Sequence, residues 1–353
     1  MTHRIPAVVL GASGYVGGEL LRLLAAHPNF ELHRAVSTSQ AGQPIGATFP
    51  SLTPAWPETT FCTPQDCLAT LADLDELALF SAAPHGASAA LLAPFMDMAK
   101  KHGVRLHVVD SSADFRYRNA KDYEAVYATP HGATEVLGEF EQGVPEHVRA
   151  TDRAHVGHPG CFATAALIAA VPLCVSGYKP GSLFINGITG STGAGRSPLP
   201  GTHHPERHSN LYAYKPLVHR HTAEIAAFID KAGGSAVNVN FVPHSGPFAR
   251  GIHLTLQAEL EDAVSADALR ASYRDFYAGS SFVRVLEGTP RIKDVVTSNY
   301  CHVGVAAHGN SVVIMSAIDN LVKGAAGGAV QWMNRLWSLP ETSGLLASAP
   351  AWT

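Results

Sequence analysis

The sequence lacks the features that mark several classes of protein. Its five cysteines are an odd number and match no zinc-binding spacing. It has no block of basic residues, and no apolar run approaches the roughly 20 residues needed to cross a bilayer. These absences argue against a metal site, a nucleic-acid partner and a membrane span. The segment 1–6 does not resemble a signal peptide, and the sparse cysteines fit a reducing compartment, so we expect a cytoplasmic protein.

Apolar residues, by contrast, are abundant. Hydrophobic residues make up 46% of the 353 residues, charged residues make up 15%, and the net charge is −4. This composition predicts a folded protein rather than a disordered one. Because chains of this length usually form more than one core, we expect two domains.

The first half alternates between strand-like and helix-like patterns. Residues 7–10 form a short apolar run, typical of a buried parallel strand, and a helical pattern follows it. Further strands are predicted over 31–37, 77–81 and 106–110, with a helix over 87–102. This order predicts an α/β fold, a parallel sheet with helices on both faces, as in a Rossmann-type dinucleotide-binding domain.

The second half has longer strands with stronger alternation, typical of an antiparallel sheet packed on helices. Strands are predicted over 182–189, 236–242, 252–259 and 311–317, and helices over 223–232 and 266–277. We therefore predict a first domain over 1–160 and an α+β domain over 161–318. A helix over 319–338 is predicted to return to the first domain.

A glycine-rich loop follows the first predicted strand. Gly11, Gly14 and Gly17 are spaced G-x-x-G-x-x-G between that strand and the next helix. Glycine lets the backbone approach a pyrophosphate, and the helix N-terminus favours the phosphate charge. The loop predicts a dinucleotide site made by Gly11, Ser13, Gly14, Tyr15, Val16 and Gly17.

The end of the second predicted strand indicates which dinucleotide binds. NAD-binding domains place a carboxylate there for the ribose 2′-hydroxyl. This chain has Ser37, Thr38 and Ser39 instead, with Arg34 nearby. Hydroxyls can bond a 2′-phosphate that a carboxylate would repel, so Ser37 and Ser39 favour NADP. The alternative is that these residues only form a turn.

Cys161 is the candidate nucleophile. It follows His158-Pro159-Gly160 and precedes the small, apolar, helix-forming run 163–170. A cysteine at a helix N-terminus is favoured as the reactive thiolate, which can form a thioester. The alternative is a buried, unreactive cysteine, which we expect for Cys174.

Three arginines in loops are candidate anion ligands. Arg116 follows the strand ending at Asp110, and Arg196 follows the strand ending near Thr189, together with Ser191. We expect the Ser191–Arg196 loop to offer hydroxyls and free backbone N–H groups to an anionic substrate. Arg250, after the strand near 241–244, is a further candidate. The alternative for Arg116 and Arg196 is a surface ion pair.

A histidine pair opens one of the predicted helices. His221 lies three residues before Glu224, so both can share a helix face, and a carboxylate beside an imidazole suits a general acid/base. His219 is the less favoured choice, and His244 is a second candidate base. The alternative is an exposed pair at the start of a surface helix.

At this point the sequence resembles the N-acetyl-gamma-glutamyl-phosphate reductases, which act in arginine biosynthesis. The resemblance is carried in order along nearly the whole chain by the motifs at 11–17, 111–116, 158–165, 193–196, 219–224 and 319–327. It implies a second domain of the glyceraldehyde-3-phosphate dehydrogenase-like type, used for substrate binding and dimerisation. It also implies Cys161 as the nucleophile, Asn320 near the nicotinamide, and Pro84 within a cofactor loop over 81–86. Members work as homo-tetramers or homo-dimers. The His-rich stretch 203–208 matches nothing in the family pattern.

The resemblance implies reduction of an acyl phosphate by NADPH through a cysteine thioester, with no metal. Two alternatives stay open. One is aspartate-semialdehyde dehydrogenase, which performs the same chemistry on a shorter substrate. The other is a non-catalytic NADP-sensing regulator, which would need the glycine loop but no activated thiol. The N-acyl group of the substrate is left open.

Overall fold

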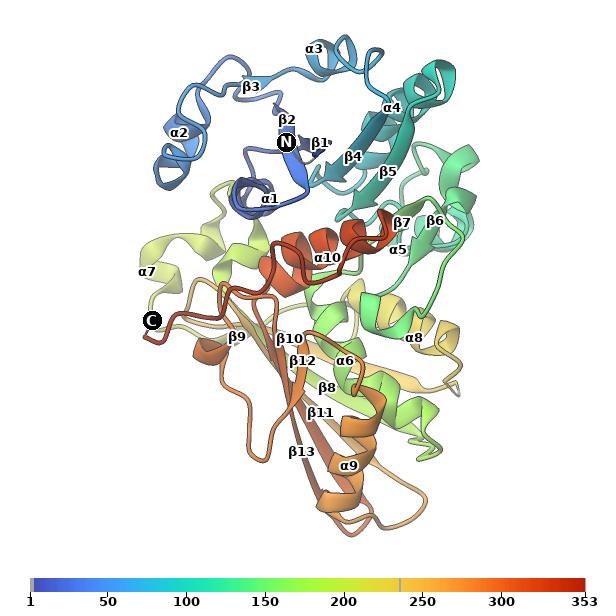
Figure 1. Ribbon diagram of the computed structural model, residues 1–353. Coiled ribbons are helices and arrows are strands. Elements are labelled where there is room, and N and C mark those ends of the chain that lie inside the picture. Colours follow the sequence, from blue (N-terminus) through green and yellow to red (C-terminus); the bar gives the residue numbers. More distant parts are fainter. Residues whose placement is uncertain (1–2, 235, 353) are drawn as a thin grey trace. The chain divides into compact units, whose positions relative to one another are not determined.

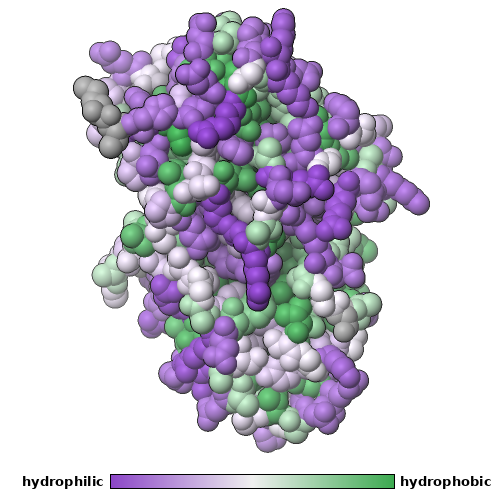
Figure 2. All heavy atoms as spheres, turned by 45° about the vertical axis from the view of Figure 1, so that its right-hand side comes forward, coloured by the Kyte–Doolittle hydropathy of each residue, from purple (hydrophilic) through white to green (hydrophobic). Residues whose placement is uncertain are grey.

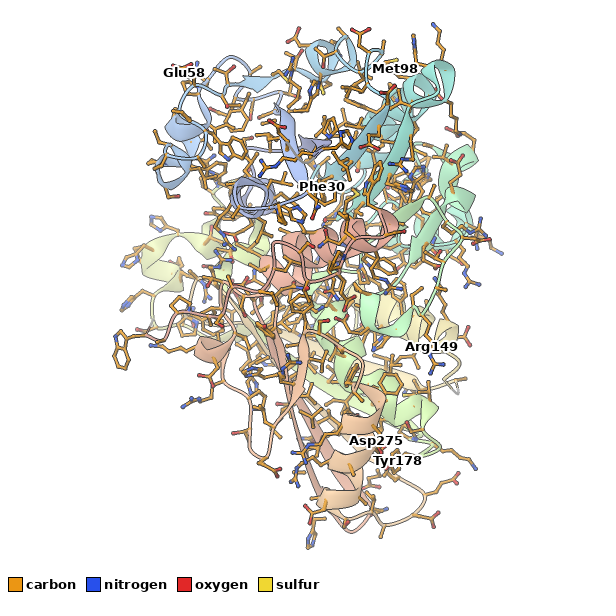
Figure 3. The ribbon with its side chains drawn as sticks, in the orientation of Figure 1. Phe30, Glu58, Met98, Arg149, Tyr178 and Asp275 are labelled. Atoms are coloured by element: carbon orange, nitrogen blue, oxygen red, sulfur yellow. The ribbon has the colours of Figure 1, made fainter. Side chains whose placement is uncertain are left out.

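The computed structural model describes residues 3–234 and 236–352, which form two compact units. The first unit contains 3–143, 150–158 and 325–346, and the second contains 144–149, 159–324 and 347–352. Residues 1 and 2, part of the segment inspected for a signal peptide, lie outside the described residues. Figure 3 labels Phe30 in the first unit and Arg149, at the end of the short segment that joins the second.

The first unit is built on a parallel sheet in the order β3-β2-β1-β4-β5-β7-β6. Its strands are β1 (Ile5–Leu10), β2 (Phe30–Val36), β3 (Phe61–Cys62), β4 (Glu76–Ser81), β5 (Arg105–Asp110), β6 (Phe140–Gln142) and β7 (His155–Gly157). Its helices are α1 (Tyr15–Ala25), α2 (Ile45–Thr48), α3 (Pro64–Leu68), α4 (Ser88–His102), α5 (Ala120–Tyr127) and α10 (Gly327–Leu336). The predicted α/β architecture is confirmed.

Side-chain alternation explains why this sheet is buried on both faces. Val8 and Leu10 of β1 pack in one apolar cluster with Leu92 and Phe95 of α4. The intervening residues of β1 point to the opposite face, where α1 and α10 contact the sheet. The continuous apolar run 7–10 therefore reflects burial from both sides.

Helix α10 joins the first unit although it is far away in sequence. It contacts β5 and α1, and the indole of Trp332 donates a 2.8 Å hydrogen bond to the carbonyl of Gly143. Figure 1 shows α10, in red, beside β5 and β7. The helix is shorter than the predicted 319–338. The carboxylate of Asp319 accepts hydrogen bonds from the N–H groups of Leu321 and Val322 (2.8 and 3.0 Å), and a π-helical turn over Val322–Ala326 precedes α10.

The second unit is built on a mixed sheet in the order β12-β13-β14-β11-β8-β10-β9. Its strands are β8 (Ser182–Thr189), β9 (Tyr212–Ala213), β10 (Asn238–Ser245), β11 (Ile252–Glu259), β12 (Val283–Val285), β13 (Cys301–His308) and β14 (Ser311–Ile318). Strands β8, β11, β14 and β13 are antiparallel, as expected, but β8 and β10 are parallel. The chain between β8 and β10 contains helix α8 (His221–Lys231), a crossover that parallel neighbours require.

Helices α6 (Cys161–Val175), α8 and α9 (Ala266–Phe276) pack on this sheet or on each other. Almost every residue of α6 is buried, and the hydroxyls of Tyr273 and Tyr277 donate to its carbonyl groups at Ala169 and Ile168 (2.6 and 2.7 Å). Figure 3 labels Asp275 on α9. In contrast, Phe184 of β8 is 54% exposed, so part of the sheet surface carries no helix.

No helix in the described part of the chain is long and apolar enough to cross a membrane. On the face drawn in Figure 2, polar and apolar residues are interspersed. Many of the apolar residues are buried in clusters within each unit, such as the one that packs β1 on α4 in the first unit and the one around α6 in the second.

Candidate active site

The glycine loop of the first unit adopts a conformation that only glycine allows at two positions. Gly11 has φ +70°, and a Cβ there would lie 2.5 Å from the carbonyl oxygen of Ala82. A Cβ on Gly17 would lie 2.5 Å from the carbonyl oxygen of Gly11. Gly14 is the N-cap of α1 and contributes no side chain to the cap, and the first turn of α1 has no acidic residue. The backbone therefore presents an uncapped helix N-terminus that fits a diphosphate.

The hydroxyl groups of Ser13, Ser37 and Ser39 form a series of contacts at this loop. The Oγ of Ser37, at the carboxyl end of β2, lies 2.7 Å from the Oγ of Ser13 and 3.5 Å from that of Ser39. Ser37 is buried, whereas Ser39 is exposed. The residues predicted to meet a 2′-phosphate are thus placed next to the residues predicted to meet the pyrophosphate.

The loop between β4 and α4 is held by a carboxylate that the sequence reasoning did not assign. Asp114 is buried and accepts hydrogen bonds from the N–H groups of Gly86 (2.7 Å) and Ala89 (3.0 Å). Pro84 lies exposed in the same loop. Asp114 lies in the Ser111–Arg116 motif, which follows β5, and β5 is the neighbour of β4 in the sheet. The position of this aspartate in the motif is the feature of the sequence from which the contact could have been predicted.

Arg116 is buried in the first unit and has protein acceptors. Its Nε donates to the carbonyl of His158 (2.8 Å) and its Nη2 to that of Ser111 (2.9 Å). These contacts tie together two segments that follow β5 and β7. The geometry therefore gives Arg116 a scaffolding role, and its predicted contact with substrate stays a prediction.

Cys161 is the first residue of α6, with Gly160 as N-cap, as the Pro-Gly turn predicts. It is partly buried, and Gly324 packs against it so closely that a Cβ on Gly324 would lie 2.7 Å from the Cβ of Cys161. Cys174 is buried in the same helix, and burial raises the pKa of its thiol to about 11. One cysteine of α6 is therefore placed at the helix N-terminus and the other is kept as an unreactive thiol.

Glu224 connects the start of α6 to the histidine pair. Its side chain is 0% exposed, its Oε1 accepts a 2.7 Å hydrogen bond from the N–H of Gly160, and its Oε2 lies 3.8 Å from His221 Nε2. Glu224 and His221 lie in the first turn of α8, so the predicted common helix face is confirmed. Both histidines are buried, which contradicts the alternative of an exposed pair.

The two histidines differ in their surroundings. The Nδ1 of His219 accepts a hydrogen bond from the N–H of His221 (3.2 Å). Burial, followed by the charges of Arg220 and Lys215, lowers the pKa of His219 to about 4. His219 is therefore neutral near pH 7 and is a poor proton donor there. Nearby, burial and then the charge of Cys161 raise the pKa of Tyr214, which places that phenol in the electrostatic surroundings of the sulfur.

The loop that carries Ser191 and Arg196 differs from expectation in one respect. The prediction of free N–H groups is wrong for Ser191 and Thr192, because their N–H groups donate to the carbonyls of Phe248 and Ala249 (2.9 and 3.1 Å). The loop lies against the β10–β11 connection, and this packing uses its donors. Arg196 is exposed, and Ser191 is partly buried with its Oγ 3.5 Å from the carbonyl of Phe248.

Arg250 and Asn320 also have partners in the second unit. The Nε and Nη2 of Arg250 donate to the two carboxylate oxygens of Asp319 (3.0 and 3.2 Å). Asn320 accepts from the N–H of Gly251 (2.7 Å) and donates to Thr192 Oγ1 (3.0 Å). Asp319 is fully buried and was not predicted as a site residue. Together these residues join the 190s loop, the β10–β11 connection and the segment that leads to Gly324.

His244, the second candidate base, lies in β10 and pairs in register with Ile188 and Ala213. Its Nδ1 is buried and has no hydrogen-bond partner among the described residues. The second unit therefore brings together Cys161, His219, His221 and Glu224 around the first turn of α6. Asn320 contacts Gly251 and Thr192, and His244 lies on strand β10.

Comparisons with known proteins find a matching protein family for each of the two units. Residues 6–149 match the family model described as semialdehyde dehydrogenase, NAD binding domain, and residues 161–320 match the model described as semialdehyde dehydrogenase, dimerisation domain. N-acetyl-gamma-glutamyl-phosphate reductases are 40% identical in Methanopyrus kandleri (96% of each chain) and 37% identical in Methanosarcina barkeri (98% of this chain, 99% of the relative).

Solved structures show the same fold at low identity. The aspartate semialdehyde dehydrogenase II of Vibrio cholerae, complexed with ASA, has a TM-score of 0.69 at 15% identity and covers 96% of this chain and 99% of its own. The enzyme of Candida albicans, solved with NADP, has a TM-score of 0.65 at 15% identity and covers 94% and 98%. These structures show the two-unit architecture, in which the first unit is an NAD(P)-binding domain.

Proposed function

This chain belongs to the N-acetyl-gamma-glutamyl-phosphate reductase family, and on that premise we propose that it reduces N-acetyl-γ-glutamyl phosphate to the 5-semialdehyde with release of phosphate, a step of arginine biosynthesis. It is an oxidoreductase with an NAD(P)-binding domain. The observation that carries the proposed chemistry is Cys161 at the N-terminus of α6, next to a Glu224 carboxylate that bonds Gly160 and faces His221.

We propose that the Cys161 thiolate attacks the acyl carbon of the substrate. The C–O bond to phosphate then breaks, and the acyl group remains on sulfur as a thioester. A bound NADPH would supply the hydride that reduces this thioester. The product of this reduction is a thiohemiacetal, and His221 supplies and later removes the proton on its oxygen. The C–S bond then breaks, which releases the semialdehyde and restores the thiolate. Glu224 holds His221 in position.

Only some of the predicted substrate ligands are well placed for that role. Ser191 and Arg196 lie on the loop beyond β8, and we propose that they contact the phosphate end of the substrate. We propose positioning roles for Arg116 and Arg250, because their guanidinium groups already bond carbonyl groups and the Asp319 carboxylate.

We propose NADP as the preferred cofactor. The support is the Ser13–Ser37–Ser39 series of hydroxyls at the end of β2, where an NAD-specific domain has a carboxylate. Gly11, Gly14, Tyr15, Val16 and Gly17 would hold the pyrophosphate, and Pro84 and Asn320 are proposed to flank the rest of the cofactor.

Replacing the exposed Ser39 by aspartate tests this preference. We expect the KM for NADP to rise at least about tenfold, because the new carboxylate repels the 2′-phosphate, while the KM for NAD stays level or falls. Ser39→Asn is the uncharged control. An unchanged NADP/NAD ratio in Ser39→Asp would contradict the proposed position of the 2′-phosphate.

We propose a homo-dimer or homo-tetramer assembled through the second unit. The match to a dimerisation domain over 161–320 supports this, as does the helix-free sheet surface marked by Phe184. Light scattering after size exclusion measures the mass of the assembly, and a monomer at micromolar concentration would contradict the proposal. The predicted cytoplasmic location stays a prediction.

The substrate is tested by assaying phosphate-dependent oxidation of two semialdehydes with NADP. We expect N-acetyl-glutamate 5-semialdehyde to be oxidised and aspartate semialdehyde to be a poor substrate. Preference for aspartate semialdehyde would reassign the activity. Binding of NADP without turnover of either compound would favour a cofactor-sensing protein.

A further inference from the structure

A buried arginine in the His-rich stretch 203–208 lacks a counter-charge. Arg207 ends the short helix α7 (His204–Arg207) and is 8% exposed. Its Nη1 donates to the carbonyls of Asn210 (3.0 Å) and Ser245 (3.5 Å). Its Nε and Nη2 are also buried, yet within residues 3–234 and 236–352 they meet no hydrogen-bond acceptor and no carboxylate. A guanidinium stays charged at all physiological pH values, so burial in this form calls for an anion.

The positions of the two unsatisfied nitrogens indicate the chemical class and geometry of the anion. Nε–H and Nη2–H lie along one edge of a guanidinium and bind the two oxygens of a carboxylate in parallel. The same unit contains a completed example, because Arg250 uses this edge to bind both oxygens of Asp319. In Arg207 the equivalent donors, Nε and Nη2, have no carboxylate partner among the described residues. We call this pair of donors the Arg207 edge.

Arg207 is attached to the end of the sheet where the proposed substrate loop begins. Ser245, which accepts from Nη1, is the last residue of β10 and pairs with Thr189, the last residue of the parallel strand β8. The loop with Ser191 and Arg196 follows Thr189 directly. Ligands of α/β proteins commonly bind at the carboxyl ends of parallel strands. The Arg207 edge is therefore anchored at the same sheet end as the candidate phosphate ligands.

We infer that the Arg207 edge binds the carboxylate of the substrate, an inference that rests on the proposed function. That substrate has two anionic ends. Its phosphate leaves during the reaction, whereas its carboxylate must be held through both the acylation and the reduction. A buried, planar, two-donor site suits the end that stays. The other arginines considered for this task, Arg116 and Arg250, are already bonded within the protein.

Entry of the ligand requires a local movement, because protein atoms cover both nitrogens. Ser209, two residues after Arg207, has φ +57°, a left-handed conformation that residues with side chains rarely adopt. Lys215 and Leu217 share this feature (φ +45° and +63°). These three residues make the chain after α7 a candidate for that movement, because a left-handed backbone costs free energy in residues with a side chain.

The experiment compares Arg207→Gln with the wild type in phosphate-dependent oxidation of N-acetyl-glutamate 5-semialdehyde and of its α-methyl ester. For the acid we expect Arg207→Gln to raise the KM on the order of 100-fold, since a buried charge pair is lost. The KM values for phosphate and NADP should stay within about twofold. For the ester, which has no carboxylate, both proteins should show the same high KM. Arg274→Gln, at an exposed ion pair on α9, is the matched control.

The outcomes separate this inference from the proposed function. A wild type that oxidises neither compound would contradict the function itself. An active wild type with an unchanged KM in Arg207→Gln, or with a raised KM for phosphate instead of the semialdehyde, would overturn the Arg207 assignment alone. If Arg207→Gln does not fold, Arg207→Lys keeps the charge with a single ammonium group. We expect this variant to lower the preference for acid over ester at least tenfold, and an unchanged preference would overturn the assignment.

Discussion

At the scale of single residues, the structure separates chemical groups that look alike in the sequence. Cys161 and Cys174 belong to one helix, but only Cys161 is at its N-terminus, while burial raises the pKa of Cys174. His219 and His221 are two residues apart, but only His221 faces the Glu224 carboxylate. In each pair the two residues differ in their position relative to a helix end or a buried charge, and this difference is the basis of the roles that we propose.

Replacement of Cys161 by serine tests the covalent route. We expect Cys161→Ser to lose at least about 10³-fold in turnover, because a serine hydroxyl at this position is not ionised and cannot form the thioester. NADPH affinity, measured by fluorescence titration, should be unchanged. Cys174→Ser is the control in the same helix and should retain turnover, with a lower free energy of unfolding because the new hydroxyl is buried. Substantial activity in Cys161→Ser would exclude the covalent mechanism.

Replacement of His221 by asparagine tests the acid/base assignment. Turnover is expected to fall by about 10²–10⁴-fold, and the limb of the pH–rate profile that reports this imidazole should disappear. His219→Asn should have the smaller effect on that profile, because the pKa of His219 is already about 4 and the group does not titrate near neutrality. A profile that is altered by His219→Asn and not by His221→Asn would reverse the two roles.

At the scale of elements, a π-helical turn packs against Cys161, the proposed nucleophile. The π-helical turn Val322–Ala326 contains Gly324, which packs on Cys161, and Lys323, whose buried Nζ lies 2.5 Å from the Oε1 of Glu146. The ring of Phe282 lies 5.6 Å from the same Nζ. An ion pair in such surroundings holds the turn in one place, since neither charge can be left behind without its partner.

Removing one partner of this pair should therefore be costly. Lys323→Met leaves Glu146 buried without its cation and is expected to lower the free energy of unfolding by about 3–5 kcal/mol. The double variant Lys323→Met/Glu146→Leu removes both charges and should recover most of this loss. Denaturant titration of the wild type and both variants gives the values. A single variant as stable as the wild type would show that the pair does not hold the turn.

At the scale of the whole molecule, each unit contains a buried histidine that resists protonation. In the first unit, the Nδ1 of His27 accepts from the N–H groups of Asn29 and Phe30, and its Nε2 lies 3.1 Å from the amide oxygen of Asn334. Burial lowers the pKa of His27 to about 4, and that of His219 in the second unit to about 4. A third proton-poor position is His147, also with a pKa lowered to about 4 by burial.

These histidines predict acid instability. Their folded pKa values lie below the usual 6.5, so the unfolded chain takes up protons first as the pH falls. The contribution of these neutral histidines to the free energy of unfolding should be full above about pH 6.5 and should be lost progressively down to about pH 4. For His27 the contribution is on the order of 3 kcal/mol. Unfolding free energy measured against pH should show a smaller decline in His27→Gln than in the wild type, with the exposed His102→Gln as control. Parallel curves for all three proteins would contradict the assignment to His27.

The sequence by itself determined the features that depend on neighbours along the chain. The βαβ order, the glycine loop and the start of α6 at Cys161 all follow from local patterns, because strand burial, helix spacing and a Pro-Gly turn act over a few residues. The shared helix face of His221 and Glu224 is predictable for the same reason. The family motifs identify the chemistry, since they place those residues in a known order.

Only the tertiary structure decided which residues that are distant in sequence become partners. The parallel pairing of β8 with β10, the bond from Gly160 to Glu224 and the Arg250–Asp319 pair each join distant segments. The prediction of free N–H groups was wrong for Ser191 and Thr192 for that reason, because the β10–β11 connection supplies their acceptors. The Arg207 edge emerges in the same way. Burial and hydrogen bonding are properties of the packed chain, and a sequence pattern alone cannot show which donors remain unsatisfied after packing.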